Sequence, residues 1–445
     1  MSTLVYGTSI RGNGHYRAGI ECQDSTSFCE KDFLADKIKL IALSDGHGEP
    51  TCQRSVIGAN VATLIAREEL YRCVLKLAPT LDELDTLNEI IKSPPRHIKR
   101  EGDGVSAELS LIKDHASYLS SQISEALDGV KSKIIDKWRC AVLKDFSENP
   151  LAILSAEESI DETKLLLPAY ASKTEKGILL SRQVLKSNAQ AQITENPYIV
   201  YGATLLACAQ YKEHIFLLKL GDGSITILDS DGKAVEPIKS KPEEIANATE
   251  SLCQKYASKL MQSAYLKCKA KIILLCTDGV TNALDSEESL GELAGGLYES
   301  INEEPRKLRC EFNDFLRGFS DATDDDCSIG FIANEIDDYA YEIIKNTEDG
   351  EENEINVSCN AHSFDLEKEG YTLAWENNIL ALVNENGEKG DKLQPVCCTL
   401  TTLTLEDDEI KATKEEKKYL VLSSNDKNTT LANITEKLYN ELIAE

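Results

Sequence analysis

The chain contains 445 residues, enough for two or three domains of ordinary size. Hydrophobic residues make up 42% and charged residues 28%, a globular balance that excludes a mainly disordered chain. The formal charge is −28, and because such a surface repels phosphate backbones and anionic lipid, we expect no nucleic acid and no membrane among the partners. The sequence has no apolar run of about 18 residues and no signal-peptide core near Met1, so we predict a cytoplasmic protein.

The 14 cysteines include no C-x-x-C pair, and the six histidines show no zinc-finger spacing with them. A structural zinc site is therefore the weaker interpretation. In a chain without an export signal, we expect mostly reduced cysteines that serve as small buried hydrophobic residues.

The N-terminal part predicts strands followed by a helix. Ile38–Ser44 is a short apolar run rich in β-branched residues, and it stops at Asp45-Gly46, which is typical of a strand that ends in a turn. Ser55–Leu75 then carries apolar residues close to helical spacing.

Residues 80–196 differ in character from the segments around them. Pro94-Pro95 interrupts the pattern, and polar, helix-favouring sequence follows through Ala107–Leu127 and Val130–Leu143. Because no strand-like run occurs there, we interpret this stretch as a helical insertion.

Strand signals return after the insertion. Runs with short connections between them predict an antiparallel meander: Tyr198–Gln210, His214–Leu220 and Ser224–Leu228. Lys271–Cys276 predicts another buried strand, which ends at Thr277–Gly279. Two helices and a last strand are expected at Leu290–Ile301, Pro305–Phe319 and Ile329–Ala333.

A shift in composition near residue 335 predicts a boundary between two domains, residues 1–334 and 335–445. The second part holds 26 acidic and 10 basic residues and so carries −16 of the −28. Its expected elements are strands at Tyr371–Trp375, Ile379–Val383, Cys398–Leu405 and Tyr419–Leu422, and a closing helix at Leu431–Ile443. We predict a small, acidic, β-rich C-terminal domain of unknown role.

Several aspartates follow or interrupt apolar strand-like runs, and most have a glycine neighbour. Any one of them alone is best explained as a turn residue. Together they suggest more, because the strand ends of a sandwich gather in space, and gathered carboxylates repel one another unless a cation neutralises them. These residues are Asp24, Asp45, Asp222, Asp278 and Asp325.

The absence of His or Cys in this set favours a hard divalent cation. Mg²⁺ and Mn²⁺ take oxygen ligands, often a few carboxylates and several waters, whereas zinc sites usually contain nitrogen or sulfur ligands. We therefore expect Mn²⁺ or Mg²⁺ at these residues.

With its motifs in order, the sequence resembles the metal-dependent 2C-type (PPM) Ser/Thr protein phosphatases. Gly14-His15 ahead of the first motif is most similar to the bacterial branch of the family. One such motif is a weak signal, but six in the family's order within residues 8–333 are a strong one. The motifs are Q-D at Gln23-Asp24, D-G-H-G at Asp45–Gly48, G-A-T at Gly202–Thr204, L-G-D-G at Leu220–Gly223, T-D-G-V at Thr277–Val280 and D-D-x-S at Asp325–Ser328.

The resemblance implies an α+β fold, a four-layer α/β/β/α sandwich of two antiparallel sheets flanked by helices, with two metal ions at one end of the strands. By motif, Asp45 would bridge the two ions and the Gly46 carbonyl would join one of them. Asp278 and Asp325 would hold the other ion. The implied activity is hydrolysis of phosphoserine and phosphothreonine on proteins by a metal-activated water, without a phospho-enzyme.

Three further residues receive roles from the same resemblance. Asp24 would act near the ions, directly or through water, and Asp222 would serve a third, weaker metal position. His47 is the candidate general acid, because the leaving alkoxide needs a proton and histidine has a suitable pKa. The alternative for His47 is a turn histidine that bonds its own loop.

The sequence departs from the family where the substrate phosphate is held. The family usually has an arginine at the position of Gly19. The family's G-D-S-R motif is replaced by G-D-G-S at Gly221–Ser224, so an arginine is absent there too. Arg17 is our candidate for the phosphate ligand, with Arg11 as the other choice, because arginine binds phosphate through two hydrogen bonds. Either could equally be a solvated surface charge.

Three functions stay open at this point. The first is a phosphatase acting on phosphorylated proteins, with a cognate Ser/Thr kinase as a candidate partner. The second is a catalytically silent regulatory module that binds a phosphoprotein or kinase, which the replaced arginines keep open. The third is a phosphatase for small phosphorylated metabolites. The complete set of metal aspartates favours the first. The insertion and the C-terminal part would serve either partner docking or stability.

Overall fold

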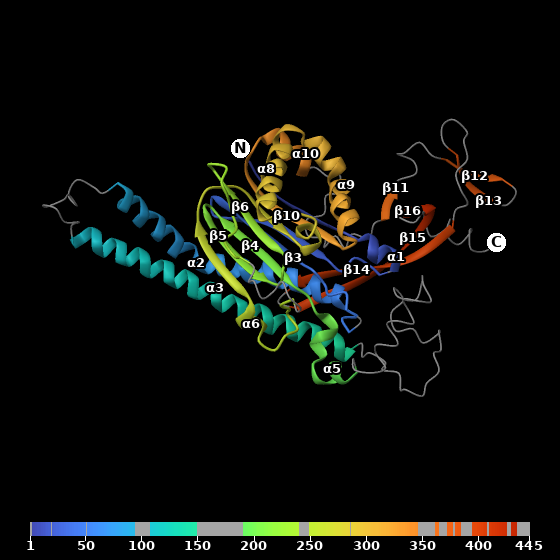
Figure 1. Ribbon diagram of the computed structural model, residues 1–445, viewed down its shortest axis with the longest axis horizontal. Helices are drawn as coiled ribbons and strands as arrows, with labels where there is room; N and C mark the ends of the chain where they lie inside the picture. Colours follow the sequence, from blue (N-terminus) through green and yellow to red (C-terminus); the bar gives the residue numbers. More distant parts are fainter. Residues whose placement is uncertain are drawn as a thin grey trace.

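Two antiparallel sheets pack face to face, and helices cover both outer faces (Figure 1). The predicted four-layer α+β sandwich is therefore confirmed. This computed structural model describes residues 2–18, 20–49, 51–93, 107–148, 190–239, 249–284 and 286–345, together with the strands between residues 361 and 433. Within these ranges, no helix combines the length and the apolar content needed to cross a membrane.

Each of the two sheets has five strands. The first has the order β2-β3-β4-β5-β8, formed by Ser25–Phe33, Asp36–Ser44, Leu205–Tyr211, His214–Leu220 and Gln262–Lys267. The second has the order β1-β10-β9-β6-β7, formed by Ser2–Ile10, Cys327–Ile336, Ala270–Cys276, Ser224–Asp229 and Ala234–Val235. Strands β3 and β9 end directly before D-G-H-G and T-D-G-V, as predicted.

The alternation of side chains along β3 explains why both faces of the first sheet are covered. Ile41 and Leu43 belong to the core between the two sheets. Ile38, Leu40 and Ala42 point to the other face and join the core under the helices. Since successive side chains of a strand point to opposite faces, an apolar run such as this one requires a layer on each side.

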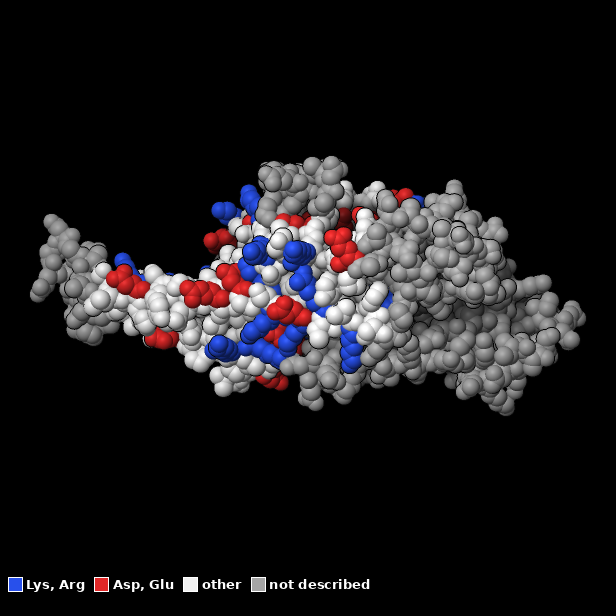
Figure 2. Space-filling view, turned by 90° about the horizontal axis from the view of Figure 1, so that it is seen from below, with Lys and Arg blue, Asp and Glu red and all other residues white. Residues whose placement is uncertain are grey.

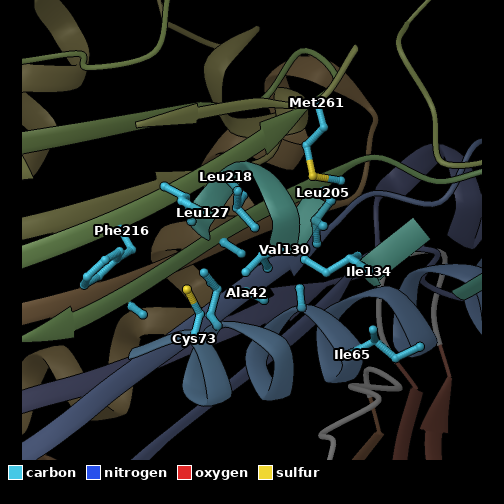
Figure 3. Close-up of a cluster of buried hydrophobic side chains, with 14 of the residues drawn as sticks. Ala42, Ile65, Cys73, Leu127, Val130, Ile134, Leu205, Phe216, Leu218 and Met261 are labelled. Carbon is cyan, nitrogen blue, oxygen red and sulfur yellow. The ribbon is translucent and has the colours of Figure 1, made fainter. Parts of the chain in front are cut away.

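Helices α2 (Ser55–Lys92) and α3 (Ala107–Glu148) form the layer over the first sheet. Figure 3 shows part of this core, where Cys73 of α2 and Val130 of α3 gather with Leu218 of β5. In Figure 1 the two helices lie side by side and extend beyond the edge of the sheets. Part of the insertion is therefore a structural layer of the sandwich.

Both helices are longer than the sequence predicted. The pattern placed the end of the first near Leu75 and divided the second after Leu127, but each is continuous. Pro79 lies on the exposed side of α2, so its ring does not interrupt the buried stripe. Across Gly129, Leu127 and Val130 are both buried at helical spacing. Apolar packing thus outweighs these local helix-breaking signals.

Helices α8 (Glu287–Glu303), α9 (Pro305–Thr323) and α10 (Asp338–Lys345) cover the outer face of the second sheet. The expected helices at Leu290–Ile301 and Pro305–Phe319 are confirmed. Helix α10 was not predicted, and it buries Ala340 against the same core as Phe331 of β10. The proposed boundary at residue 335 falls inside β10, shortly before α10 begins to pack on this layer, and the division into domains stays a prediction.

The segment before β4 was predicted wrongly. A strand was expected from Tyr198, but Pro197–Tyr201 is a 3-10 helix and β4 begins at Leu205. The Asn196 side chain accepts a hydrogen bond from the Tyr198 N–H at 3.2 Å, which caps this turn. Pro197 stands in the first turn, where a missing N–H is tolerated. The capping hydrogen bond and Pro197 therefore favour a 3-10 turn here, in spite of the β propensity of these residues.

In the C-terminal part, the predicted hairpin of β12 (Thr372–Glu376) and β13 (Ile379–Val383) is confirmed. The other two predicted strands lie inside β14 (Gln394–Glu406) and β15 (Glu409–Ser424), which pair antiparallel. The expected closing helix is wrong at its start, because β16 (Thr429–Asn433) occupies it and pairs with β15. The rest of that expected helix lies outside the described residues. Strand β11 (Ala361–Phe364) completes this sheet.

Charge is distributed unevenly over the described surface. Figure 2 shows Lys and Arg side chains gathered near the middle of one face, with Asp and Glu side chains among them. Helix α3 has an ion pair of this mixed kind, between Lys131 and Asp128 at 2.7 Å. Because such exposed pairs contribute at most about 1 kcal/mol each, the buried face of α3 holds it on the sheet, and its charges contribute little.

Candidate active site

Three of the predicted aspartates come together where strands of both sheets end. Asp45 follows β3, Asp222 lies between β5 and β6, and Asp278 begins the short helix α7 (Asp278–Thr281) after β9. One carboxylate oxygen of each lies within 4.8 Å of those of the other two, and the three side chains are half-buried. The expectation that these strand ends gather is therefore confirmed for Asp45, Asp222 and Asp278.

The turn that carries Asp45 is held by the G-A-T motif. The Asp45 N–H donates to Thr204 Oγ1 at 3.0 Å, and the Thr204 N–H donates back to the Asp45 carbonyl at 2.8 Å. The His47 N–H donates to the Gly202 carbonyl at 3.0 Å. A Cβ at Gly202 would lie 2.8 Å from His47 Cδ2, so this close approach requires glycine.

Gly46 is packed from the other side. Its N–H donates to the Gln23 carbonyl at 3.2 Å, and a Cβ there would lie only 2.7 Å from that oxygen. The Q-D motif and the D-G-H-G motif are thus in backbone contact. Glycine at this position lets two motifs that are distant in sequence fix each other.

The carboxylates of the site raise one another's pKa. Burial is the largest cause for Asp45, and the charges of Asp24, Asp278 and Asp325 add to it. Burial and the charges of Asp222 and Asp325 raise the pKa of Asp278 to about 6. The pKa of Asp325 is also raised, chiefly by burial. Asp325 therefore belongs electrostatically to the cluster, and ionising the group has an energetic cost that a bound cation relieves.

Asp24 lies deeper and is held by hydroxyl groups. Thr277 Oγ1 and Ser328 Oγ donate to its Oδ2 at 2.8 and 2.6 Å. Burial first, and then the charge of Asp326, raise its pKa well above the usual value. Its Oδ1 is buried and accepts no hydrogen bond from any described residue. One side of this carboxylate is therefore anchored, and the other has an unmet need for a cation or a water.

The site fits a hard divalent ion. Asp222 shows the same arrangement as Asp24, since its Oδ2 accepts from Thr249 Oγ1 at 2.8 Å while its buried Oδ1 has no partner among the described residues. The donor atoms are all carboxylate oxygens, which suits Mg²⁺ or Mn²⁺ better than zinc. Orphaned buried oxygens and mutual repulsion are both removed when such an ion binds.

His47 is half-buried beside this cluster. Burial lowers its pKa, and the charges of Asp222 and Glu49 oppose that shift without cancelling it. The imidazole is therefore neutral at physiological pH. A role as proton donor would require the substrate to shift this balance, and it stays a prediction.

Arg17 is not placed with the carboxylates. Its guanidinium lies 2.6 Å from Asp324 Oδ2, and both side chains are more than half exposed. The short helix α1 (Asn13–Ala18) is tied to the same residue, because the Gly14 N–H donates to the Asp324 carbonyl at 2.8 Å. The structure gives Arg17 a surface ion pair, and its role in phosphate binding stays a prediction.

Two residues near the site received no role from the sequence. Asp326 accepts hydrogen bonds from the N–H groups of Gly12 and Gln23, both at 2.6 Å, and lies 2.9 Å from His15 Nδ1. Burial lowers the pKa of His15, but the Asp326 carboxylate and the charges of Asp325 and Asp24 together outweigh it, and the net shift is upward. The signal was present in D-D-x-S, where Asp326 is the second of two adjacent aspartates.

Residues 11–317 match the family described as Protein phosphatase 2C. Similar solved structures include a C. elegans sex-determining protein at 13% identity, which covers 78% of this chain and 68% of that chain with a TM-score of 0.37. The S. agalactiae serine/threonine phosphatase has 15% identity, coverage of 75% and 100%, and a TM-score of 0.35. The catalytic domain of the phosphatase PstP, in complex with two manganese ions, has 14% identity, coverage of 74% and 97%, and a TM-score of 0.30. A comparison with curated proteins gave no match.

Proposed function

The chain belongs to the protein phosphatase 2C family, and we propose that it removes phosphate from phosphoserine and phosphothreonine side chains of proteins with the help of Mn²⁺ or Mg²⁺. The observation that carries this proposal is the cluster of Asp45, Asp222 and Asp278, whose oxygens lie within 4.8 Å of one another. A site that had lost its function would not need to retain several repelling carboxylates.

The residues that would hold the ions follow the motif order. Asp45 and the Gly46 carbonyl would serve one ion, and Asp45, Asp278 and Asp325 the other. Asp222 would take a third ion together with Asp278, and Asp24 would support the pair through its orphaned Oδ1. Bound divalent ions would supply Lewis-acid chemistry, which activates a water for attack on phosphorus and offsets charge on the phosphoryl oxygens.

The chain's own residues would position the reaction and move one proton. His47 would donate a proton to the leaving serine or threonine oxygen, as its place beside the carboxylates allows. The hydrogen bonds of His47 and Asp45 to the Gly202–Thr204 segment keep both on one rigid turn. Preorganisation of this kind avoids reorganisation during the reaction.

A second candidate function is a regulatory module that binds phosphoprotein without turnover. The observation that favours it is the surface ion pair of Arg17 with Asp324, because the predicted phosphate ligand is engaged elsewhere. A binding module would keep metal and phosphate affinity but release no phosphate. Turnover therefore separates the two functions.

The test is release of phosphate from p-nitrophenyl phosphate and from a phosphothreonine peptide, with EDTA, Mg²⁺ or Mn²⁺. We expect metal-dependent turnover by the wild type and a loss of at least about 100-fold in Asp45→Asn. Asp231→Asn is the matched control, since Asp231 lies in an exposed turn between β6 and β7. No turnover with any metal, from folded protein, would refute the phosphatase. Hydrolysis of p-nitrophenyl phosphate without the peptide would point to small metabolites.

A further inference from the structure

His15 is oriented by a buried carboxylate. Its Nδ1 lies 2.9 Å from Asp326 Oδ1, and the Asp326 side chain is only 1% exposed. Two backbone N–H groups, of Gly12 and Gln23, donate to that carboxylate at 2.6 Å each. Because the carboxylate is fixed, it fixes the imidazole, as carboxylates do for histidines in metal sites. In the imidazolium form both ring nitrogens carry a proton, so Nδ1–H faces Asp326 and Nε2–H is directed toward other groups.

The Nε2 atom of His15 faces the turn that carries the metal aspartate. A Cβ at Gly48 would lie 3.6 Å from His15 Nε2, and Gly48 is exposed. Gly48 comes one residue after His47 and three after Asp45. An imidazole N–H thus opens onto the D-G-H-G turn at Gly48. A side chain larger than glycine at residue 48 would cover it.

A second group at the same place lacks a partner. Gln23 is 3% exposed, and its Oε1 accepts no hydrogen bond from any described residue. A Cβ added to Gly48 would also lie 3.4 Å from this oxygen. The Gln23 amide is within 2.7 Å of Ser55 Oγ, and a hydroxyl can donate or accept. The Gln23 Nε2 group donates to Ser55 Oγ and lies 3.5 Å from the His47 carbonyl, so the amide is held with Oε1, an acceptor, toward Gly48.

The two nearby arginines are directed elsewhere. Arg17 pairs with Asp324 at the surface. Arg11 donates to the His15 carbonyl at 3.0 Å and lies over the Tyr16 ring. Within residues 11–17, His15 places its Nε2 atom next to the D-G-H-G turn.

We propose that His15 is a direct ligand of the substrate's phosphoryl group, in place of an arginine. This inference rests on the proposed function and adds to it the group that holds the phosphate. The ligand chemistry is a phosphate monoester or the inorganic phosphate released from it. Asp326 acts through His15 and is a positioning residue.

Two substitutions at residue 15 separate phosphate binding from a structural role. The side-chain nitrogen of asparagine is attached at Cγ, as Nδ1 of histidine is, so His15→Asn can still donate to Asp326. The side-chain nitrogen of glutamine is attached at Cδ and corresponds to Nε2, so His15→Gln can still donate to phosphate. His115→Asn is the control, since His115 is exposed on α3 and pairs with Glu83.

The full-length protein loaded with Mn²⁺ is titrated with inorganic phosphate by calorimetry. We expect phosphate affinity to fall about 10- to 100-fold in His15→Asn, the loss typical of a hydrogen bond to a charged group. His15→Gln should keep most of the phosphate affinity, and the Mn²⁺ affinity should stay the same in both variants. The unfolding midpoint should stay the same in His15→Asn, which keeps the bond to Asp326. The opposite order of the two variants, or wild-type affinity in His15→Asn, would overturn the inference and leave His15 as a support for Asp326.

Two further results decide between this inference and the proposed function. If the wild type binds phosphate through His15 but hydrolyses no ester, the inference stands and the phosphatase fails. If the wild type hydrolyses p-nitrophenyl phosphate and residue 15 changes neither phosphate affinity nor phosphate inhibition, the inference fails alone. In the wild type, phosphate should also protect His15 from diethyl pyrocarbonate, read by mass spectrometry, and equal modification with and without phosphate would overturn it.

Discussion

Replacing Asp278 with asparagine removes one charge from the cluster of Asp45, Asp222 and Asp278 while keeping the size of the side chain. The Asn282 Nδ2 group donates to Asp278 Oδ2 at 3.2 Å, and an asparagine oxygen can accept the same hydrogen bond. The substitution therefore tests repulsion with little loss of packing or hydrogen bonding. Its effect on stability should be opposite to its effect on function.

The magnitude follows from the pKa of Asp278. A rise from the ordinary 3.8 to about 6 in the folded protein corresponds to about 3 kcal/mol. Because the folded-state pKa is raised, the folded protein binds the proton more tightly than the unfolded chain does. Ionisation of Asp278 therefore lowers the free energy of unfolding. This loss is absent below pH 3.8, grows as the pH rises toward 6, and is complete above that value.

The assay is urea denaturation at neutral pH, first with EDTA and then with Mn²⁺. In EDTA, we expect Asp278→Asn to be more stable than the wild type, by up to about 3 kcal/mol. With Mn²⁺, the wild type should gain stability by mass action and the variant should gain little. Asp231→Asn should behave as the wild type. A variant that is less stable in EDTA, or that gains as much from Mn²⁺ as the wild type, would refute the reasoning.

Three other predictions follow from the same structure. Lowering the pH through 6 should weaken Mn²⁺ binding by about tenfold per pH unit for each proton displaced, because the raised pKa of Asp278 lets protons compete; a pH-independent affinity in calorimetry would contradict this. Trp138→Ala should cost about 3–5 kcal/mol in urea denaturation, since the ring is fully buried and its Nε1 donates to the Gly58 carbonyl at 2.9 Å; a cost below about 1 kcal/mol would contradict it. Gly279→Ala should weaken Mn²⁺ binding, because its Cβ would lie 1.9 Å from the Asp326 carbonyl and would push apart the segments that carry the neighbouring Asp278 and Asp325; unchanged binding would show that this contact does not position the site.

Features of the site that depend on strand ends were accessible from the sequence. The run Ile38–Ser44 ends directly before Asp45, and β9 ends directly before Thr277 and Asp278. The apolar strand pattern and the turn residues after it were therefore enough to place these aspartates at strand ends. Their proximity followed from the sandwich architecture that the motif order implied. The mutual distances of Asp45, Asp222 and Asp278 confirm this.

Features that depend on tertiary contacts were not accessible. Helix α2 continues past Leu75 because its buried side packs on the sheet and on α3, which no local signal records. Arg17 was a candidate phosphate ligand by position along the chain, but its partner Asp324 lies 307 residues away. The pairing of His15 with Asp326 spans a similar separation. Long-range contacts of this kind cannot be deduced from one sequence.

The central claim is that water attacks phosphorus directly at the aspartate cluster. The most direct measurement is a single turnover of a phosphothreonine peptide by the Mn²⁺-loaded protein in ¹⁸O-labelled water. We expect the released phosphate to carry one ¹⁸O atom, the peptide hydroxyl to carry none, and no phosphate to stay on the chain. Phosphate bound covalently to the protein, label in the peptide hydroxyl, or no release of phosphate would contradict it.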